Sequence, residues 1–437
     1  MSQLYRQLLD EIAEISVVDA HEHLMVEHER IGDKMDVCDL FCHYNRADLQ
    51  TAGMTEAELA KLFHTNAHHA RRAPDTPPLA ARWAILKKYL PAVRHTGYAR
   101  AVFITLQDLY GVDELTDANV EQVSQAITRT YAEPGLYQRI LVERCNIERV
   151  VNQAFSNKEG RAFIKDRLET NAGLMVGLLP GSVVLCAAEG NEAFLRTHGH
   201  ALPPTLDAFH DWLAARCRAW KARRDLVGFK IFPPSRHGQP ERGRPDAAAT
   251  YAHLAQGKKL EASEKQMIAL ALLHLLADVC AEEQLVCAIH LGIVAGNYGD
   301  FRNRDPLACM SFLLEHKDTR FDLYHAAMPW TRALGVIGKQ FPNVWLNLCW
   351  CAIVSPRMTV DALDEYMDLV PVNKIQAFGG DYGRPVENVY GHLVMAREIV
   401  AEVLARRIER GELSESEAPD IARLWLNRNS RVLYGLA

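Results

Sequence analysis

Several features that mark nucleic-acid-binding or membrane proteins are missing from this sequence. Its 49 lysines and arginines are outnumbered by 55 aspartates and glutamates, so the formal net charge is -6 and no basic excess favours nucleic acid or an anionic membrane. The most apolar stretch, residues 267–281 (MIALALLHLLADVCA), contains a histidine and an aspartate and is too short to span a bilayer, so we predict a buried helix there. We therefore expect a small-molecule substrate, no nucleic acid and no membrane, and the sequence leaves a homo-oligomer open.

Cysteine spacing typical of zinc ribbons is also absent. The ten cysteines include no CxxC pair. Residues 1–15 have the pattern of an amphipathic helix with acidic residues and lack the apolar core of a signal peptide. We expect a cytoplasmic protein whose cysteines are reduced and mostly buried.

The sequence does contain a regular alternation of short β-branched runs and longer helical stretches. Such an alternation is typical of parallel strands joined by crossover helices. Eight runs are predicted to be strands: 16–23, 148–155, 174–179, 227–232, 284–290, 321–325, 344–349 and 375–381. The predicted fold is a distorted (β/α)8 TIM barrel, although a doubly wound open sheet would fit the alternation alone equally well.

One connection is much longer than the others. Residues 24–145 separate the first two predicted strands, whereas a typical βαβ unit takes about 30 residues in all. The segment contains stretches at helix period, such as 55–63 and 118–131. We predict a barrel made of residues 1–23 and 146–437, and a mainly helical insertion, 24–145, that covers the mouth of the barrel.

One pair of histidines lies at the end of the first predicted strand. The strand ends in the sequence Asp19-Ala20-His21-Glu22-His23. Because side chains alternate along a strand, His21 and His23 lie on one face and Glu22 on the other. Two imidazoles on one face supply half of a zinc site. An HxH pair alone is weak evidence, since two solvated loop histidines give the same pattern.

Later strand ends add further ligand-type residues. His290, His325 and Asp381 each come directly after an apolar strand, and Lys230 lies near the end of the fourth strand. In a (β/α)8 barrel the C-terminal strand ends face one common cavity. A lone histidine of this kind more often serves packing or capping, but the recurrence in barrel order favours a metal site.

These motifs resemble the amidohydrolase superfamily, which has HxH on strand one, lysine on strand four, histidine on strands five and six, and aspartate on strand eight. The resemblance covers the first strand and the chain from about residue 226 onward. Within the superfamily, the chain is similar to the amidohydrolase 2 branch with aminocarboxymuconate semialdehyde decarboxylase and the amidohydrolase-like domain fused to some glutamine synthetases. The matching segments are 228–235 (GFKIFPPS), 288–293 (AIHLGI), 323–335 (LYHAAMPWTRALG), 378–388 (FGGDYGRPVEN) and 426–436 (LNRNSRVLYGL).

The resemblance implies a role for each strand-end residue. The predicted ligands of one divalent metal ion, most readily Zn²⁺, are His21, His23, His290 and Asp381. Asp381 would also shuttle a proton, and His325 would orient the metal-bound water or polarise the substrate, so both are predicted to be catalytic. Metal coordination lowers the pKa of a bound water from about 15.7 to about 7, which supplies hydroxide at neutral pH.

Two cations are predicted to contact the substrate. Lys230 would bind a substrate anion or pair with a carboxylate, whereas a carboxylated Lys230, as in two-metal members, would bridge a second ion. Arg384 lies three residues after Asp381 and could hold a substrate carboxylate through a bidentate contact. A surface ion pair is the alternative role of Arg384.

The predicted function is that of a metal-dependent hydrolase acting on an amide, ester or lactone bond of a small, carboxylated substrate. The close alternative is a lyase in the same site, either a decarboxylase or a hydratase, because the branch that the chain resembles includes such enzymes. Residues 42–46 (CHYNR) are similar to uronate isomerases, so isomerase chemistry is kept as well, although the later strands do not follow that family. A non-catalytic scaffold barrel is a further hypothesis, which the complete set of ligand types opposes.

Overall fold

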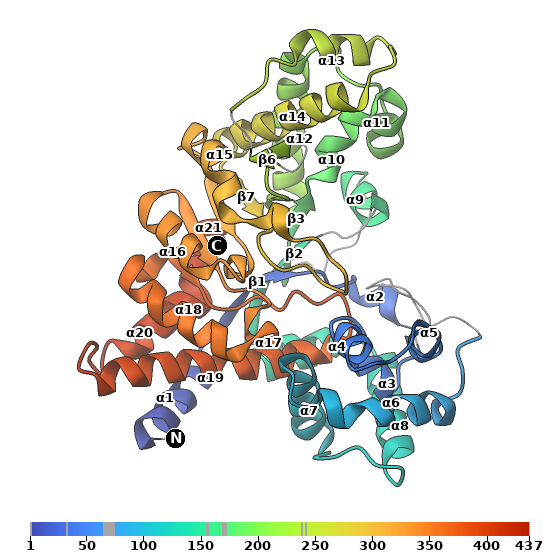
Figure 1. Cartoon of the computed structure of the whole chain (residues 1–437), viewed down its shortest axis with the longest axis vertical. Helices are drawn as coiled ribbons and strands as arrows, with labels where there is room; N and C mark the ends of the chain where they lie inside the picture. Colours follow the sequence, from blue (N-terminus) through green and yellow to red (C-terminus); the bar gives the residue numbers. More distant parts are fainter. Residues whose placement is uncertain are drawn as a thin grey trace.

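The sheet at the centre of the molecule has eight parallel strands in chain order. The computed structural model describes residues 2–31, 34–63, 75–153, 157–165, 167, 173–236, 239–240 and 243–436. The strand order is β1-β2-β3-β4-β7-β8-β9-β10, and helices flank the sheet (Figure 1). Because neighbouring strands follow one another in the chain, every crossover joins adjacent strands, as in a (β/α)8 barrel. The predicted TIM-barrel class is confirmed.

The strands are short and mostly buried, as expected where helices cover the outer face of a parallel sheet. They are β1 (Val17–Glu22), β2 (Ile147–Gln153), β3 (Met175–Pro180), β4 (Leu226–Ile231), β7 (Val286–Ile289), β8 (Arg320–Leu323), β9 (Val344–Asn347) and β10 (Ile375–Gln376). All eight begin within two residues of the predicted start, and residues 154–155 of the second prediction lie outside the described part. A small antiparallel pair, β5 (Ser235–Arg236) and β6 (Gln239–Pro240), was not predicted.

The last strand is shorter than predicted, because β10 ends at Gln376. Beyond it the backbone bends but still pairs with β1. The Ala20 amide donates to the Phe378 carbonyl at 3.3 Å, and the Asp381 amide donates to the His21 carbonyl at 2.8 Å. These bonds nearly close the barrel and hold the first and last predicted ligand segments side by side.

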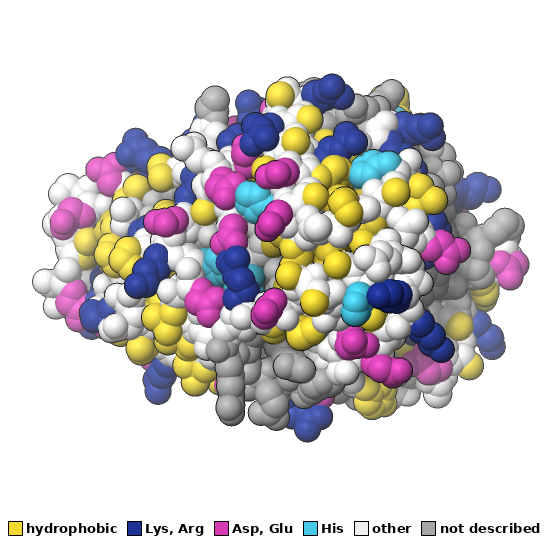
Figure 2. Space-filling view, turned by 90° about the horizontal axis from the view of Figure 1, so that it is seen from above, with side chains coloured by type: hydrophobic (Ala, Val, Ile, Leu, Met, Phe, Trp, Pro, Cys, Tyr) yellow, Lys and Arg dark blue, Asp and Glu magenta, His cyan; other side chains and the backbone are white. Residues whose placement is uncertain are grey.

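Helices fill the connections after β2 and flank the chain ends. They are α1 (Gln3–Ala13), α9 (Asn157–Ile164), α10 (Ser182–Leu185), α11 (Asn191–His198), α12 (Leu206–Arg224), α13 (Ala248–Ala255), α14 (Ala262–Glu282), α15 (Met310–Glu315), α16 (Thr331–Gln340), α17 (Cys351–Val354), α18 (Pro356–Leu369), α19 (Glu387–Glu409), α20 (Ala418–Arg423) and α21 (Asn429–Tyr434). None of the helices in the described ranges has the length and apolar character needed to cross a membrane. Seen from the end occupied by α13, acidic and basic side chains are interspersed with hydrophobic ones (Figure 2).

The connection between β1 and β2 is helical, as predicted. Its helices are α2 (Glu27–Arg30), α3 (Val37–Leu40), α4 (Asn45–Thr51), α5 (Glu56–Phe63), α6 (Leu79–Val93), α7 (Gly97–Tyr110), α8 (Val120–Ala132) and the π-helix η1 (Gln138–Arg144). Leu40 and Leu59 of this segment belong to the same hydrophobic cluster as Val17 of β1 and Val400 of α19. One continuous hydrophobic core therefore joins the insertion and the barrel. The division of the chain into these two domains stays a prediction.

Candidate active site

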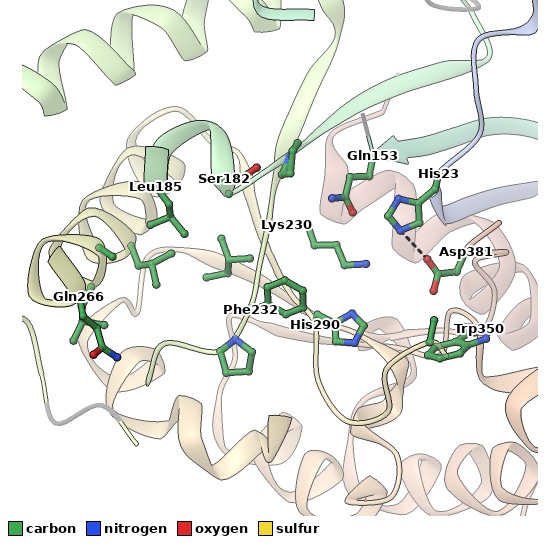
Figure 3. A pocket seen from close by; sticks show the side chains of 18 of the residues that line it. His23, Gln153, Ser182, Leu185, Lys230, Phe232, Gln266, His290, Trp350 and Asp381 are labelled. Atoms are coloured by element: carbon green, nitrogen blue, oxygen red, sulfur yellow. Dashed lines mark ion pairs between the residues drawn. The ribbon is translucent and has the colours of Figure 1, made fainter. Parts of the chain in front are cut away.

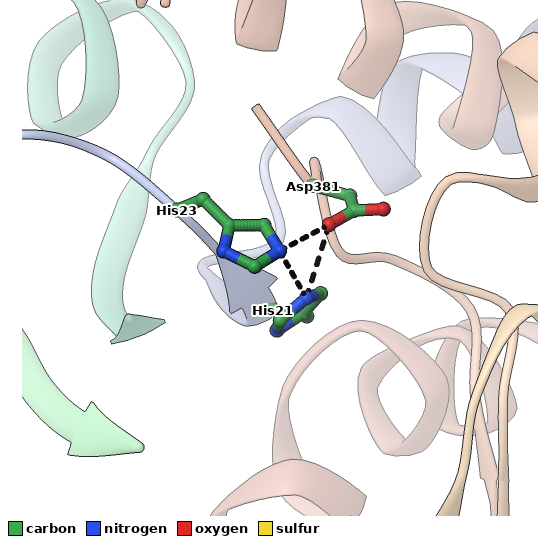
Figure 4. A group of neighbouring side chains, drawn as sticks. All are labelled: His21, His23 and Asp381. Carbon is green, nitrogen blue, oxygen red and sulfur yellow. Dashed lines mark hydrogen bonds and ion pairs between the residues drawn. The ribbon is translucent and has the colours of Figure 1, made fainter. Parts of the chain in front are cut away.

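Three ligand-type side chains meet where β1 and the segment after β10 lie together (Figure 4). The Nε2 atoms of His21 and His23 are 3.1 Å apart, and each is 3.0 Å from Oδ1 of Asp381. Ligand atoms bound at about 2.1 Å to one ion stand about 3 Å apart when they subtend roughly a right angle. The three atoms therefore have the spacing of ligands to a single divalent cation.

The protonation states of this group also suit a metal ion. Burial lowers the pKa of His21 to about 3 and holds the pKa of His23 well below its usual range, so both imidazoles are neutral. Burial alone would raise the pKa of Asp381, but His21 and Lys230 hold it well below its usual value. Neutral imidazoles and an ionised carboxylate are the forms that bind divalent metals. The donor set fits the predicted cofactor.

Two glycines let Asp381 approach β1 this closely. A Cβ on Gly379 would lie 2.6 Å from Cβ of Cys349, and a Cβ on Gly380 would lie 1.8 Å from Oε1 of the buried Glu22. Asp381 itself has a left-handed backbone, with φ of 60°. The bend after β10 thus needs both glycines, because any side chain there would push the carboxylate away from the histidines.

We expect Gly380→Ala to destabilise the fold by about 1–3 kcal/mol, the usual cost of overpacking a core. Turnover should also fall, because Glu22 must shift, and His21 and His23 are its direct neighbours in the chain. Chemical denaturation and steady-state kinetics measure both effects. Gly160→Ala in α9 is the control, because its Cβ would meet Val183 at an ordinary 3.4 Å. Equal losses in the two variants would contradict the tight packing at Gly380.

His325 and His290 form a hydrogen-bonded pair beside this group. His290 Nε2 lies 3.0 Å from the Ile293 carbonyl and must donate to it, so its Nδ1 accepts from His325 Nε2 at 3.1 Å. His325 Nδ1 then accepts from the Cys349 thiol, 3.4 Å away. If Nδ1 of His325 carried the proton instead, it would donate to the Cys349 carbonyl at 3.1 Å. Nε2 of His325 and Nδ1 of His290 would then face each other with one lone pair each, which is unfavourable.

Of the predicted metal ligands, His290 alone lies outside the group of three. Burial holds its pKa well below the usual range and lowers the pKa of His325 to about 4, so the pair is neutral. Both ring nitrogens of His290 already face protein atoms, as described above. The structure brings His21, His23 and Asp381 together, and the role of His290 as a fourth ligand stays a prediction.

The two predicted substrate-binding cations have different surroundings. Lys230 is buried, its Nζ lies 2.7 Å from Nε2 of His21 and 4.9 Å from the centre of the Tyr324 ring, and burial lowers its pKa. Arg384 is also buried, and its carbonyl accepts a hydrogen bond from the Cys42 thiol at 3.8 Å. Lys230 faces the pocket described next, whereas Arg384 is not among the residues that line it.

A pocket of about 510 Å³ opens beside these side chains (Figure 3). At one end His23, Lys230, His290 and Asp381 point toward one another, with Trp350 below them in this view. At the other end the wall is mostly apolar. It is formed by α10 and α14, with Leu185, Ala269, Leu270 and Leu273 among its residues and Ser182 and Gln266 as polar members. Phe232 lies beside His290, with the ring centres 5.4 Å apart.

Sequence reasoning assigned no function to Tyr44 or Trp350, and it did not decide whether His43 reaches the cavity. All three line the pocket. The His43 and Tyr44 rings stack at 3.8 Å, and the Tyr44 hydroxyl donates to the Asp381 carbonyl. Trp350 packs edge-on against His325 at 5.3 Å. The CHYNR motif was a signal for the first two residues, but Trp350 has none in the sequence.

Comparison with protein families agrees with this geometry. The amidohydrolase family model matches residues 179–436, more than half of the chain. The chain belongs to the amidohydrolase family. It is therefore an enzyme of a metal-dependent superfamily, and its His and Asp side chains form a candidate metal-binding group. The comparison with curated proteins gives no match.

Solved structures resemble this amidohydrolase over almost its whole length. Uronate isomerase from Thermotoga maritima is 15% identical, covers 99% of this chain and 98% of its own, and has a TM-score of 0.74. Glucuronate isomerase from Caulobacter crescentus is 16% identical, with coverages of 99% and 94% and a TM-score of 0.77. A candidate metal-dependent hydrolase from Lactobacillus casei is 15% identical, with coverages of 98% and 97% and a TM-score of 0.61. At these identities the likeness shows a shared fold.

Proposed function

We propose that this amidohydrolase is a metal-dependent hydrolase that cleaves an amide, ester or lactone bond in a small, carboxylated substrate with an apolar body. The observation that carries the proposal is the polarity of the pocket. Its polar end holds His23, His290, Asp381 and Lys230, and its other end is lined mainly by aliphatic side chains, with Ser182 and Gln266 as polar members.

The residues at the polar end have separate tasks in this proposal. His21, His23 and Asp381 would hold the metal ion, which when bound supplies Lewis acidity and lowers the pKa of water. The ionised Asp381 carboxylate accepts a proton from the attacking water and returns it to the leaving group. Lys230 offers an ammonium for the substrate carboxylate, and the His325–His290 pair borders the same end of the pocket.

The apolar end favours a substrate with a hydrocarbon group. Each buried CH₂ contributes about 0.8 kcal/mol to binding. A polyhydroxylated substrate would instead place hydroxyl groups against Leu270 and Leu273, where they lose their hydrogen bonds to water. Chain length in the apolar part of the substrate should therefore raise kcat/KM until the pocket is filled.

Isomerisation of a sugar acid is the second candidate. It is favoured by the whole-chain likeness to uronate and glucuronate isomerases, which extends through the helical segment after β1. His43 and Tyr44 of that segment line the pocket, where they could contact sugar hydroxyl groups. The apolar far wall opposes this candidate, and it makes hydrolysis the better supported reaction.

We expect the zinc-loaded enzyme to hydrolyse N-acyl amino acids, as measured by the free amino group released, or carboxylated lactones, as measured by proton release. Glucuronate should remain unchanged in its proton NMR spectrum. Leu185→Trp should raise KM most for the longest acyl groups, because it fills the far end, whereas Leu195→Trp on the exposed face of α11 should match the parent. Turnover of glucuronate without any hydrolysis would overturn the proposal, and carbon dioxide release without added water in the product would assign a lyase.

A further inference from the structure

A second cluster of ligand-type side chains lies between α14 and the end of α15, and none of its members lines the active-site pocket. We call His274, Glu315 and His316 the α14–α15 cluster. Their ligand atoms Nδ1, Oε2 and Nε2 all lie within 4.8 Å of one another. His274 is fully buried and His316 is 4% exposed, whereas Glu315 reaches solvent. The cluster is therefore buried on its imidazole side and open on its carboxylate side.

Hydrogen bonding around His316 fixes which of its nitrogens carries a lone pair. Its Nδ1 lies 3.1 Å from Oδ1 of Asp278, one turn after His274 on α14. The other oxygen of this carboxylate, Oδ2, accepts a hydrogen bond from Arg244 at 2.7 Å, so Asp278 serves as an acceptor on both sides. The Nδ1 atom of His316 must donate, and its Nε2 presents a lone pair to the other members of the cluster.

The His274 ring then has two acceptors at one nitrogen. Its Nδ1 lies 2.8 Å from the His316 lone pair and 3.4 Å from Oε2 of Glu315. A single N–H can point at only one of them. A cation placed among the three atoms would instead accept a lone pair from each.

We propose that His274, Glu315 and His316 bind a second divalent metal ion, separate from the active site, with Asp278 as the positioning residue of His316. Two imidazoles and one carboxylate are a set that suits zinc, and a carboxylate behind a ligating histidine is the usual support of such sites. The ion would tie α14 to α15. Because α14 also supplies Leu270 and Leu273 to the pocket, the tie would stabilise the apolar wall.

Zinc stoichiometry of the full-length chain tests this proposal independently of turnover. After chelation and titration with ZnCl₂, we expect two equivalents bound to the parent and one to the His21→Ala/His23→Ala variant. Adding Glu315→Gln and His316→Ala to that variant should remove the remaining equivalent and the rise in Tm that zinc produces. Asp278→Asn should weaken the second site by about 10–100-fold, as expected for support of a ligating histidine.

The single variant Glu315→Gln should fold like the parent, because this side chain is exposed. It should weaken zinc binding at the second site at least tenfold. Glu192→Gln, at an exposed position of α11, is the matched control and should bind zinc like the parent. The proposal is overturned if the His21→Ala/His23→Ala variant, with the circular dichroism of the parent, binds no zinc. It is equally overturned if Glu315→Gln and His316→Ala leave the second equivalent unchanged.

Discussion

His21→Ala is expected to remove one equivalent of bound metal and, with it, turnover. The His21 ring is fully buried, and its Nε2 lies 3.0 Å from Asp381, 3.1 Å from His23 and 2.7 Å from Lys230. Its loss leaves two candidate ligands of the group and an open space between them. Because metal catalysis contributes several kcal/mol to transition-state stabilisation, we expect kcat/KM to fall about 10³-fold or more.

Metal analysis and kinetics on the same preparation check this result. His210→Ala is the matched control, because this histidine lies on α12 and pairs with Glu282 at the surface. It should keep the metal content and rate of the parent. A folded His21→Ala variant with full metal content and the parent rate would show that the group of three does not hold the catalytic ion.

The sequence predicted the strands well because each is a short apolar run between longer helical stretches. The prediction was wrong at the end of β10, where apolar residues continue to Phe378 but strand pairing with β9 stops at Gln376. The reason is three-dimensional. Gly379 and Gly380 must lie against Cys349 and β1, and no local pattern reveals that a neighbouring strand approaches so closely.

The candidate site was predictable where it depends on alternation along one strand, and less so where it depends on loop conformation. The HxH pair and Asp381 meet as predicted. His290 lies beside this group and pairs with His325, whose backbone is left-handed with φ of 63° and is followed by Ala326 and Ala327 at 47° and 48°, so its role as a fourth ligand stays a prediction. Such angles are unusual for residues other than glycine, so no local pattern indicates them at these positions.

The apolar end of the pocket was hidden for a related reason. Residues 267–281 were predicted to be a buried helix, and α14 confirms this. Apolar residues surround that helix on most sides, so periodicity could not tell which side lines a pocket and which side packs in the core. Leu270 and Leu273 line the pocket, whereas Leu272 and Leu276 of the same helix belong to the core cluster and do not line it; Leu273 contributes to both.

Asp381→Asn is expected to separate metal binding from catalysis. The amide keeps the shape of the side chain and one weak oxygen ligand, but it removes the basic carboxylate. The low pKa of Asp381 means that this base is ionised throughout the neutral range, so its loss should be felt at every pH where the enzyme works. General acid and base groups contribute about 10²–10⁴-fold, and kcat should fall by that factor.

Metal content should fall much less than the rate in Asp381→Asn, because His21 and His23 remain. Asp364→Asn removes a partly buried carboxylate of α18 that is paired with Arg407 and Arg410. It controls for the loss of a charge and should keep the parent kcat. Added formate should restore part of the rate in Asp381→Asn if only the proton acceptor is missing. If Asp381→Asn instead turns over substrate at nearly the parent rate with its metal fully bound, the carboxylate is only structural, and the proton must travel through another group of the pocket.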